Sequence, residues 1–193
     1  IIEDPSLLKC LQNLAYDQFY CEHIYVFSTL SLREVLKNFK LEIFDVENTK
    51  THGGSNRYYI KKNINSLYKI SNRVKIEIKK ELQFGINKFS TYQTFAKKVK
   101  ISKNKLLKIF SSLSKKKLRI VGYGATAKSC TVLNYCGLGK NDIKYFYDTT
   151  SYKVNKYLPG SKILIKKYKK LNRKEIDVVF LGAWNFKKEI FKK

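Results

Sequence analysis

The last third of the sequence alternates short apolar runs with turns, and this alternation limits the possible folds more than any other feature. The first run leads into a glycine-containing turn and then a helical segment through residue 135. Repeated strand–turn–helix units place successive strands parallel to one another. We therefore expect a parallel sheet flanked by helices over 115–193. Its predicted strands are 118–121, 143–147, 163–165 and 176–181.

The middle of the chain, residues 61–114, has a helical pattern. It is rich in lysine, contains no proline and one glycine, Gly85, and its apolar residues recur at helical spacing. This spacing predicts two or three amphipathic helices. We therefore expect a helical linker over 61–114 between two α/β regions, 1–60 and 115–193.

The first 60 residues combine strand and helix patterns with polar loops. Residues 41–46 alternate with period two, which indicates a half-buried strand. Ser31 can cap a helix, supported by Glu34 three residues later. In order, we expect the end of a strand at 1–5, a helix over 7–16, a short strand at 25–27, a helix from 31 to 39, and strands over 41–46 and 57–60.

The chain is strongly basic, with 40 lysines and arginines against 15 acidic residues and a formal charge of +25. Such an excess attracts polyanions of any kind, including nucleic acid, anionic membranes and phosphorylated metabolites. The lysines are scattered over most segments, which favours a solvated surface without a specific nucleic-acid partner. No apolar run approaches the roughly 18 residues that span a bilayer, so no membrane partner is predicted.

The cysteines and the lack of methionine bear on the cellular compartment of the protein and on whether the chain is a whole reading frame. The four cysteines, at positions 10, 21, 130 and 136, fit neither a zinc site nor a dense disulfide framework. They indicate reduced thiols in a cytoplasmic protein, with no metal site in this chain. The sequence contains no methionine and begins without a signal peptide, so we expect a fragment of a longer reading frame.

Acid–base side chains gather in the largely aromatic run 16–25, where Asp17, Glu22 and His23 occur. A histidine beside a carboxylate can act as a general base, because its pKa lies near working pH and the neighbour can hold its tautomer. Tyr20 can donate a hydrogen bond to a substrate oxygen on which negative charge develops. The alternative is a capped helix with a structurally bonded histidine.

A second polar segment centres on two adjacent glycines. Paired glycines permit positive φ and let a ligand approach the backbone closely. The neighbouring side chains add hydrogen-bond donors suited to a sugar or a phosphate. The same segment would also suit a plain hairpin turn. Its candidate binding residues are Thr51, His52, Gly53, Gly54, Ser55 and Arg57.

A third candidate is Gly122-x-Gly124 after the first strand of the C-terminal region, with Lys128 just inside the next helix. Backbone N–H groups at a helix N-terminus bind anions, and glycine lets a phosphate come close. The dinucleotide-binding pattern is incomplete, because Ala127 stands at the third glycine position. Asp148, 24 residues after Gly124, stands near the place of a ribose-binding acid. The turn is a phosphate-binding candidate, with an NAD site as the alternative.

Eight motifs follow one another along nearly the whole chain: Glu3–Pro5, Tyr16–Ser28, Asp45–Glu47, Thr51–Arg57, Gly122–Lys128, Leu133–Gly137, Tyr157–Gly160 and Ala183–Asn185. In this order they resemble the C-terminal portion of the S-adenosylmethionine-dependent sugar C-methyltransferases, which act on nucleotide-linked keto-deoxysugars. The resemblance implies that residues 1–60 end a methyltransferase-type α/β domain. It also implies that 115–193 form a Rossmann-like domain.

The resemblance further implies a reaction and roles for its residues. A carbon next to a keto group loses a proton, and the enolate attacks the methyl group of S-adenosylmethionine. His23 would be the general base, Glu22 its orienting partner, and Tyr20 a hydrogen-bonding group near the keto oxygen. The nucleotide-sugar substrate would contact the Thr51–Arg57 candidates and, in the C-terminal region, Gly122, Gly124, Lys128 and Asn134.

The sequence also departs from the family's pattern. A complete member has an N-terminal zinc-binding segment and a glycine-rich loop that contacts the methyl donor, and neither is present in this sequence. We therefore expect the chain alone to lack methyl transfer unless a separate polypeptide supplies the missing half. Thr126 and Ser129 stand where proline and glycine would be expected, which leaves the shape of that turn open.

Two other functions are compatible with the sequence. A binding module without catalysis would use the Rossmann-like part to hold a nucleotide or a nucleotide sugar. Nucleic-acid binding driven by the charge of +25 would be independent of sequence and steeply dependent on salt. No recognition motif supports the nucleic-acid alternative.

Overall fold

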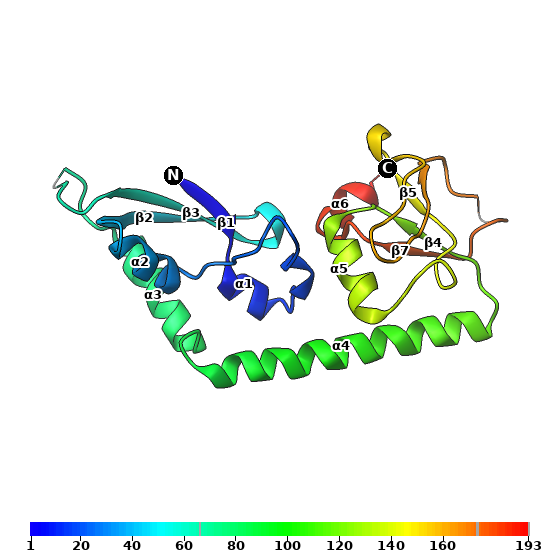
Figure 1. The fold of residues 1–193 in the computed structure, drawn as a ribbon, viewed down its shortest axis with the longest axis horizontal. Coiled ribbons are helices and arrows are strands. Elements are labelled where there is room, and N and C mark those ends of the chain that lie inside the picture. Colours follow the sequence, from blue (N-terminus) through cyan, green and yellow to red (C-terminus); the bar gives the residue numbers. More distant parts are fainter. Residues whose placement is uncertain (66, 173, 193) are drawn as a thin grey trace. The chain divides into compact units, whose positions relative to one another are not determined.

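The computed structural model describes residues 1–65, 67–172 and 174–192. The chain divides into two compact units, Ile1–Lys98 and Val99–Lys193 (Figure 1). Both units combine helices with strands, which confirms the predicted α/β class. The limits of 61 and 114 for a linker remain predictions.

The first unit is built on an antiparallel sheet. Its strands are β1 (Ile2–Pro5), β2 (Leu41–Thr49) and β3 (Ser55–Lys62), in the order β1-β3-β2. The register sets Arg57 of β3 opposite Glu3 on one side and Glu47 on the other. The predicted period-two strand is confirmed in β2, although a β-bulge between Ile43 and Asp45 interrupts its alternation.

Helices cover one face of this sheet (Figure 1). The helices are α1 (Leu7–Gln12), which follows β1, and α2 (Thr29–Lys37) and α3 (Asn72–Phe84), which pack against β2. Between helices and sheet lies a core of buried side chains: Leu32, Leu36, Ile43, Val46, Tyr58 and Val74. Burial raises the pKa of Tyr58 to about 12. Because side chains alternate along a strand, Arg57 and Tyr59 point to the opposite face.

Two predictions in this unit are wrong at the level of elements. Residues 25–27 form no strand, because this segment pairs with no neighbouring strand in the described chain. High β-propensity needs such a neighbour to become a strand. The carbonyl of Phe27 instead accepts the N–H of Leu7 (3.1 Å). The helix expected over 7–16 ends at Gln12, two residues before Leu14 takes a positive φ of 53°.

The start of α2 also differs from the prediction. Its N-cap is Ser28 and not Ser31: the Ser28 hydroxyl oxygen accepts the Ser31 N–H (3.0 Å), and the Ser31 oxygen accepts the Ser28 N–H (3.0 Å). The Glu81 carboxylate on α3 accepts the next two N–H groups, from Thr29 (2.6 Å) and Leu30 (2.9 Å). A cap supplied from 52 residues away leaves no local pattern in the sequence.

The described part of 61–114 contains α3 and α4 (Phe89–Lys115), in agreement with the predicted helices. α3 ends at Gly85, whose φ of 85° is left-handed and whose N–H donates to Leu82 O (3.0 Å). The next residue, Ile86, packs with Leu8 and Leu11 of α1. The end of α3 is therefore fixed against the first helix.

The second unit contains a parallel sheet, which confirms the Rossmann-like prediction. Its strands are β4 (Ile120–Tyr123), β5 (Phe146–Asp148), β6 (Ile165–Lys167) and β7 (Val178–Leu181), in the order β6-β5-β4-β7. Helix α5 (Ala127–Cys136) connects β4 to β5, and α6 (Lys187–Ile190) follows β7. Its core contains Phe110 of α4 and buried residues of the sheet and α5: Ile120, Leu133, Phe146 and Ile165.

Short 3₁₀ helices lie in the loops: η1 (Tyr16–Gln18), η2 (Thr51–Gly53), η3 (Ser151–Lys153) and η4 (Trp184–Phe186). Across the described residues, no helix combines the length and apolar composition that crossing a membrane requires. The same residues contain no cluster of three or more histidine, cysteine, aspartate or glutamate side chains able to hold a metal ion.

Candidate active site

The turn from Tyr20 to His23 forms the centre of the candidate site. The His23 N–H donates to the Tyr20 carbonyl (2.8 Å), and the two rings meet edge to face with centroids 4.8 Å apart. Burial raises the pKa of the Tyr20 hydroxyl, and the negative charge of Glu22 adds to the increase. Tyr20 is therefore protonated at neutral pH and can donate a hydrogen bond.

His23 lies between side chains from two other elements. Its Nδ1 is 3.5 Å from Oδ1 of Asp4 on β1, and its ring meets that of His52 on η2 edge to face, with centroids 5.9 Å apart. The His23 side chain is 15% exposed, so the imidazole is sheltered yet still reachable. A histidine in this setting can exchange a proton with a ligand.

The carboxylate beside His23 is thus that of Asp4, while Glu22 is exposed to solvent. Burial raises the pKa of Asp4, although His23 and the Phe27 amide favour its ionised form. The Glu3–Pro5 motif contains Asp4, but the sequence does not place it beside His23, because it lies 19 residues earlier, in a strand. The orienting role of Glu22 remains a prediction.

The predicted binding loop, residues 51–55, adjoins His23 and is tied to the first helix and the segment after it. Its carbonyl groups accept hydrogen bonds from side chains and one backbone amide. The bonds run from Gln18 Nε2 to His52 O, from Asn13 Nδ2 to Gly53 O (3.4 Å), from Ser6 N to Gly54 O (3.1 Å) and from Ser55 Oγ to Thr51 O (3.0 Å). These bonds hold the loop and its histidine beside the Tyr20–His23 turn.

The conformation of this loop explains its glycines. Gly54 has a φ of 129°, and a Cβ there would lie 2.9 Å from Cγ of Lys9. His52 also has a positive φ, 55°, which is uncommon for a residue with a side chain. The glycines therefore meet a requirement of the protein's own packing as well as leaving the backbone open.

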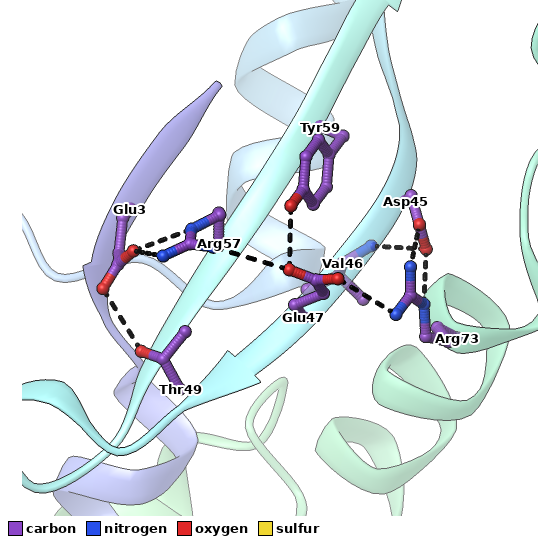
Figure 2. Close-up of polar contacts among 8 residues, drawn as sticks. All are labelled: Glu3, Asp45, Val46, Glu47, Thr49, Arg57, Tyr59 and Arg73. Carbon is purple, nitrogen blue, oxygen red and sulfur yellow. Dashed lines mark hydrogen bonds and ion pairs between the residues drawn. The ribbon is translucent and has the colours of Figure 1, made fainter.

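Arg57, the last predicted residue of this segment, takes part in ion pairs across the open face of the sheet (Figure 2). Its guanidinium lies 2.8 Å from Oε2 of Glu3 and 3.6 Å from Oε2 of Glu47. Glu47 also contacts Arg73 of α3 (3.3 Å), and Arg73 pairs with Asp45 and lowers its pKa to about 2. The structure thus gives Arg57 partners within the protein.

In the second unit, the two predicted phosphate-binding glycines pack against protein. A Cβ on Gly122 would lie 2.4 Å from the Phe146 ring, and a Cβ on Gly124 would lie 2.6 Å from Cβ of Ala183. Gly124 also has a φ of 84°. These glycines let β4 approach a ring on β5 and let the turn after β4 approach the loop after β7. Both glycines thus meet a requirement of the protein's own packing, and their role in binding phosphate remains a prediction.

The N-terminus of α5 is capped from within the protein. Thr126 Oγ1 accepts the Ser129 N–H (3.1 Å), and the Ser129 hydroxyl donates to Gly124 O (2.8 Å). This cap gives the turn the shape that the sequence left open. Asp148 Oδ2 accepts the Ala125 N–H (2.8 Å), so a carboxylate already lies at the turn. A phosphate placed there would meet a like charge.

A cleft of about 280 Å³ opens where β4, β5 and β7 end. In open α/β sheets this is the position at which ligands bind. Aromatic Tyr123 and Phe186 line the cleft together with Asp148, Lys153 and Glu189. The Lys153 ammonium donates to Ala125 O (2.9 Å) and lies 3.7 Å from Oδ2 of Asp148. Aromatic faces and polar groups of both charges suit a polar organic ring better than a bare phosphate.

The remaining predicted binding residues, Lys128 and Asn134, lie on α5. Lys128 is buried, and its ammonium is 5.6 Å from the centroid of the Trp184 ring. Asn134 Nδ2 donates to Pro159 O (3.2 Å), in the turn before β6. Gly124 lines the cleft, whereas Lys128 and Asn134 contact other parts of the unit.

The chain is an α/β protein with a Rossmann-like parallel sheet in its second unit, and in its first unit a turn brings His23 and Tyr20 beside Asp4 of the sheet. The family model described as C-methyltransferase C-terminal domain matches residues 50–193, and the chain belongs to this family. The chain is 30% identical over 189 residues to the C-methyltransferase NovU of Streptomyces niveus. That alignment covers 98% of this chain and 45% of NovU, so the chain spans a little under half the length of this relative.

Proposed function

We propose that this chain forms the C-terminal half of an S-adenosylmethionine-dependent C-methyltransferase that acts on a nucleotide-linked keto-deoxysugar in the cytoplasm. The family and the similarity to NovU support methyl transfer to carbon. The observation that carries the proposal is the position of His23, sheltered beside the carboxylate of Asp4 and the ring of Tyr20. Proton abstraction next to a keto group needs a positioned base of this kind.

In the proposed reaction His23 is the general base. It removes a proton from the carbon next to the keto group, so the C–H electrons form the enolate and His23 becomes an imidazolium. Tyr20 donates a hydrogen bond to the keto oxygen, on which negative charge develops. S-adenosylmethionine, when bound, supplies the methyl group that this carbon takes up.

We propose that the residues described in this chain do not form the methyl donor's main site. The two glycines of the 51–55 loop have their carbonyl groups bonded to Asn13 and Ser6. The glycines of the second unit pack against Phe146 and Ala183. We therefore propose that residues outside this chain hold the donor, in a preceding segment or a separate polypeptide. Any zinc would likewise lie in that other segment.

We propose that the nucleotide sugar contacts residues 51–55, because His52 adjoins the ring of His23. The substrate roles of Arg57, Lys128 and Asn134 stay part of the proposal. Each of these side chains has a contact within the protein that a substrate would have to share.

The test is transfer of a labelled methyl group to a nucleotide-linked keto-deoxysugar, with the chain combined with its donor-binding half. We expect a methylated product, and His23→Ala is expected to lower kcat by about 10³-fold because the base is lost. Cys21→Ala, an exposed neighbour in the same turn, is the matched control and is expected to keep its activity. Undiminished transfer by His23→Ala would contradict the proposal. The chain alone is expected to give no product.

A nucleotide-binding module without catalysis is the second candidate, and the cleft at the ends of β4, β5 and β7 favours it. Calorimetry with a nucleotide sugar separates the two candidates. Binding that survives His23→Ala, together with no methylation in any combination of chains, would favour the module.

A further inference from the structure

We infer that Asp4 is the residue that positions His23 for proton transfer, by holding Nδ1 of the imidazole and leaving Nε2 to accept the substrate's proton. This inference rests on the proposed function of His23. It gives Asp4 the orienting role that the resemblance to the sugar C-methyltransferases assigns to Glu22.

The strand that carries Asp4 fixes its position. β1 pairs with β3 and sets Asp4 opposite Asn56, and the next residue, Pro5, is buried opposite Ser55. The proline ring restricts the backbone at this point. The Phe27 amide, at the end of the segment that carries the catalytic turn, favours the ionised form of Asp4. Asp4 of the sheet therefore lies beside the segment on which the base lies.

Distance and burial suit an orienting carboxylate. Oδ1 of Asp4 lies 3.5 Å from Nδ1 of His23, and the two side chains are 19% and 15% exposed. This is an ion-pair distance, and catalytic hydrogen bonds are often longer before the substrate binds. With a proton on Nδ1 facing Asp4, the lone pair of the neutral ring is on Nε2.

Asp4 also supplies the charge that the reaction needs. Its Oδ2 is buried and accepts no hydrogen bond from the described residues. The Tyr20 hydroxyl from the same turn and the His52 imidazole from η2 also face His23. Neither is negative at neutral pH, so the Asp4 carboxylate is the group that stabilises the imidazolium.

Glu22 lacks these features. Its side chain is exposed, and its charge acts on Tyr20, whose pKa it helps to raise. The interaction of an exposed carboxylate passes through water and is screened by salt. Glu22→Gln is therefore a matched control for Asp4→Asn, because both replace a carboxylate by its amide near the same histidine.

The first experiment follows the imidazoles by NMR. The chain has two histidines, so His52→Gln assigns both sets of signals. Asp4→Asn is expected to move the neutral His23 ring away from the Nδ1–H tautomer, read from the ¹⁵N signals of its ring nitrogens, because the carboxylate that faces Nδ1 is removed. Glu22→Gln is expected to leave the tautomer as in the wild type. An equal change in both variants, or a larger change in Glu22→Gln, overturns the inference.

A second pair of variants guards against a failure to fold. Asp4→Ser also removes the carboxylate and is expected to give the same change of tautomer as Asp4→Asn. Asp4→Glu keeps a carboxylate but moves it, and it is expected to restore part of the Nδ1–H tautomer. A wild-type His23 tautomer in every folded Asp4 variant that lacks the carboxylate would refute the role of Asp4.

The second experiment measures activity in a preparation that transfers methyl groups. Asp4→Asn is expected to lower kcat by about 10²-fold with little change in KM. Asp4→Glu should recover part of the loss. If His23→Ala stays active, the proposed function fails, whereas the NMR result still reports whether Asp4 pairs with His23. If His23 is essential and Asp4→Asn has the wild-type kcat, the inference itself fails.

Discussion

Gly124 combines a φ of 84° with a neighbour, Ala183, at the place where a Cβ would stand. Gly137 has a similar φ of 71° but nothing within 4 Å of such a Cβ. Gly124→Ala is therefore expected to lower the free energy of unfolding by about 3 kcal/mol, from strain and overlap together. Gly137→Ala should cost about 1 kcal/mol, from strain alone. Urea unfolding of both variants measures these free energies. Equal losses in the two variants would show that the contact with Ala183 does not add to the cost of a Cβ at Gly124.

Arg57 lies between Glu3 and Glu47 on the open face of the first sheet. If its main role is this ion-pair network, Arg57→Gln should lower Tm, and the loss should shrink at about 1 M salt because exposed pairs are screened. The affinity for a nucleotide sugar should change little. Thermal unfolding at two salt concentrations and calorimetry test both parts. A large loss of affinity with an unchanged Tm would instead establish Arg57 as a binding residue.

At the scale of elements, α2 depends on Glu81 of α3 for its first N–H groups. Burial raises the pKa of Glu81 above 4.5 and outweighs these hydrogen bonds. A carboxyl whose pKa is higher in the folded state stabilises the fold at low pH, and this contribution is lost as the pH rises through the folded value. We expect Glu81→Gln to cost about 1 kcal/mol at about pH 5. The cost should be smaller at about pH 8.

Glu34→Gln on α2 is the control, because the pKa of Glu34 is lowered by Lys37. Its contribution to stability is present above the unfolded pKa and is lost as the pH falls, so its pH trend should be opposite in sign. Denaturant unfolding at the two pH values measures both variants. A cost for Glu81→Gln that grows with pH would mean that the hydrogen bonds outweigh burial.

The elements themselves could largely be predicted from local patterns. The four strands of the second unit follow from short apolar runs, and two helices follow from the spacing over 61–114. The errors arise where a distant partner decides. Ser28 caps α2 with help from Glu81, and Phe27 bonds to Leu7 and so forms no strand. Such partners are absent from any window of neighbouring residues.

At the scale of the whole molecule, the motifs identify the family, because the order in which they occur along the chain is far more specific than any single motif. The same motifs locate the Tyr20–His23 turn and the His52 loop, which the structure brings together. They include Asp4 in the Glu3–Pro5 motif but do not show that it lies beside His23, which follows from the pairing of β1 with β3. They also predict a phosphate site at Gly122 and Gly124, which stays a prediction, and they do not show that Ala183 packs against Gly124.

The charge of +25 belongs to this scale as well. Much of it is spread over exposed lysines, while Lys128 is buried against Trp184 and Lys153 is held at the turn before α5. A dispersed surface charge attracts anionic ligands at long range and is weakened by salt. Under the proposed function, this charge would raise the rate at which a nucleotide sugar meets the protein.

The central claim is that His23 takes a proton from the carbon next to the substrate's keto group. This step can be measured without methyl transfer. A nucleotide-linked keto-deoxysugar is incubated in heavy water, and ¹H NMR monitors the exchange of that proton for deuterium. With saturating substrate, the wild-type protein is predicted to exchange the proton much faster than buffer does, and His23→Ala is predicted to return the rate to that of buffer. Exchange by His23→Ala at the wild-type rate would contradict the claim.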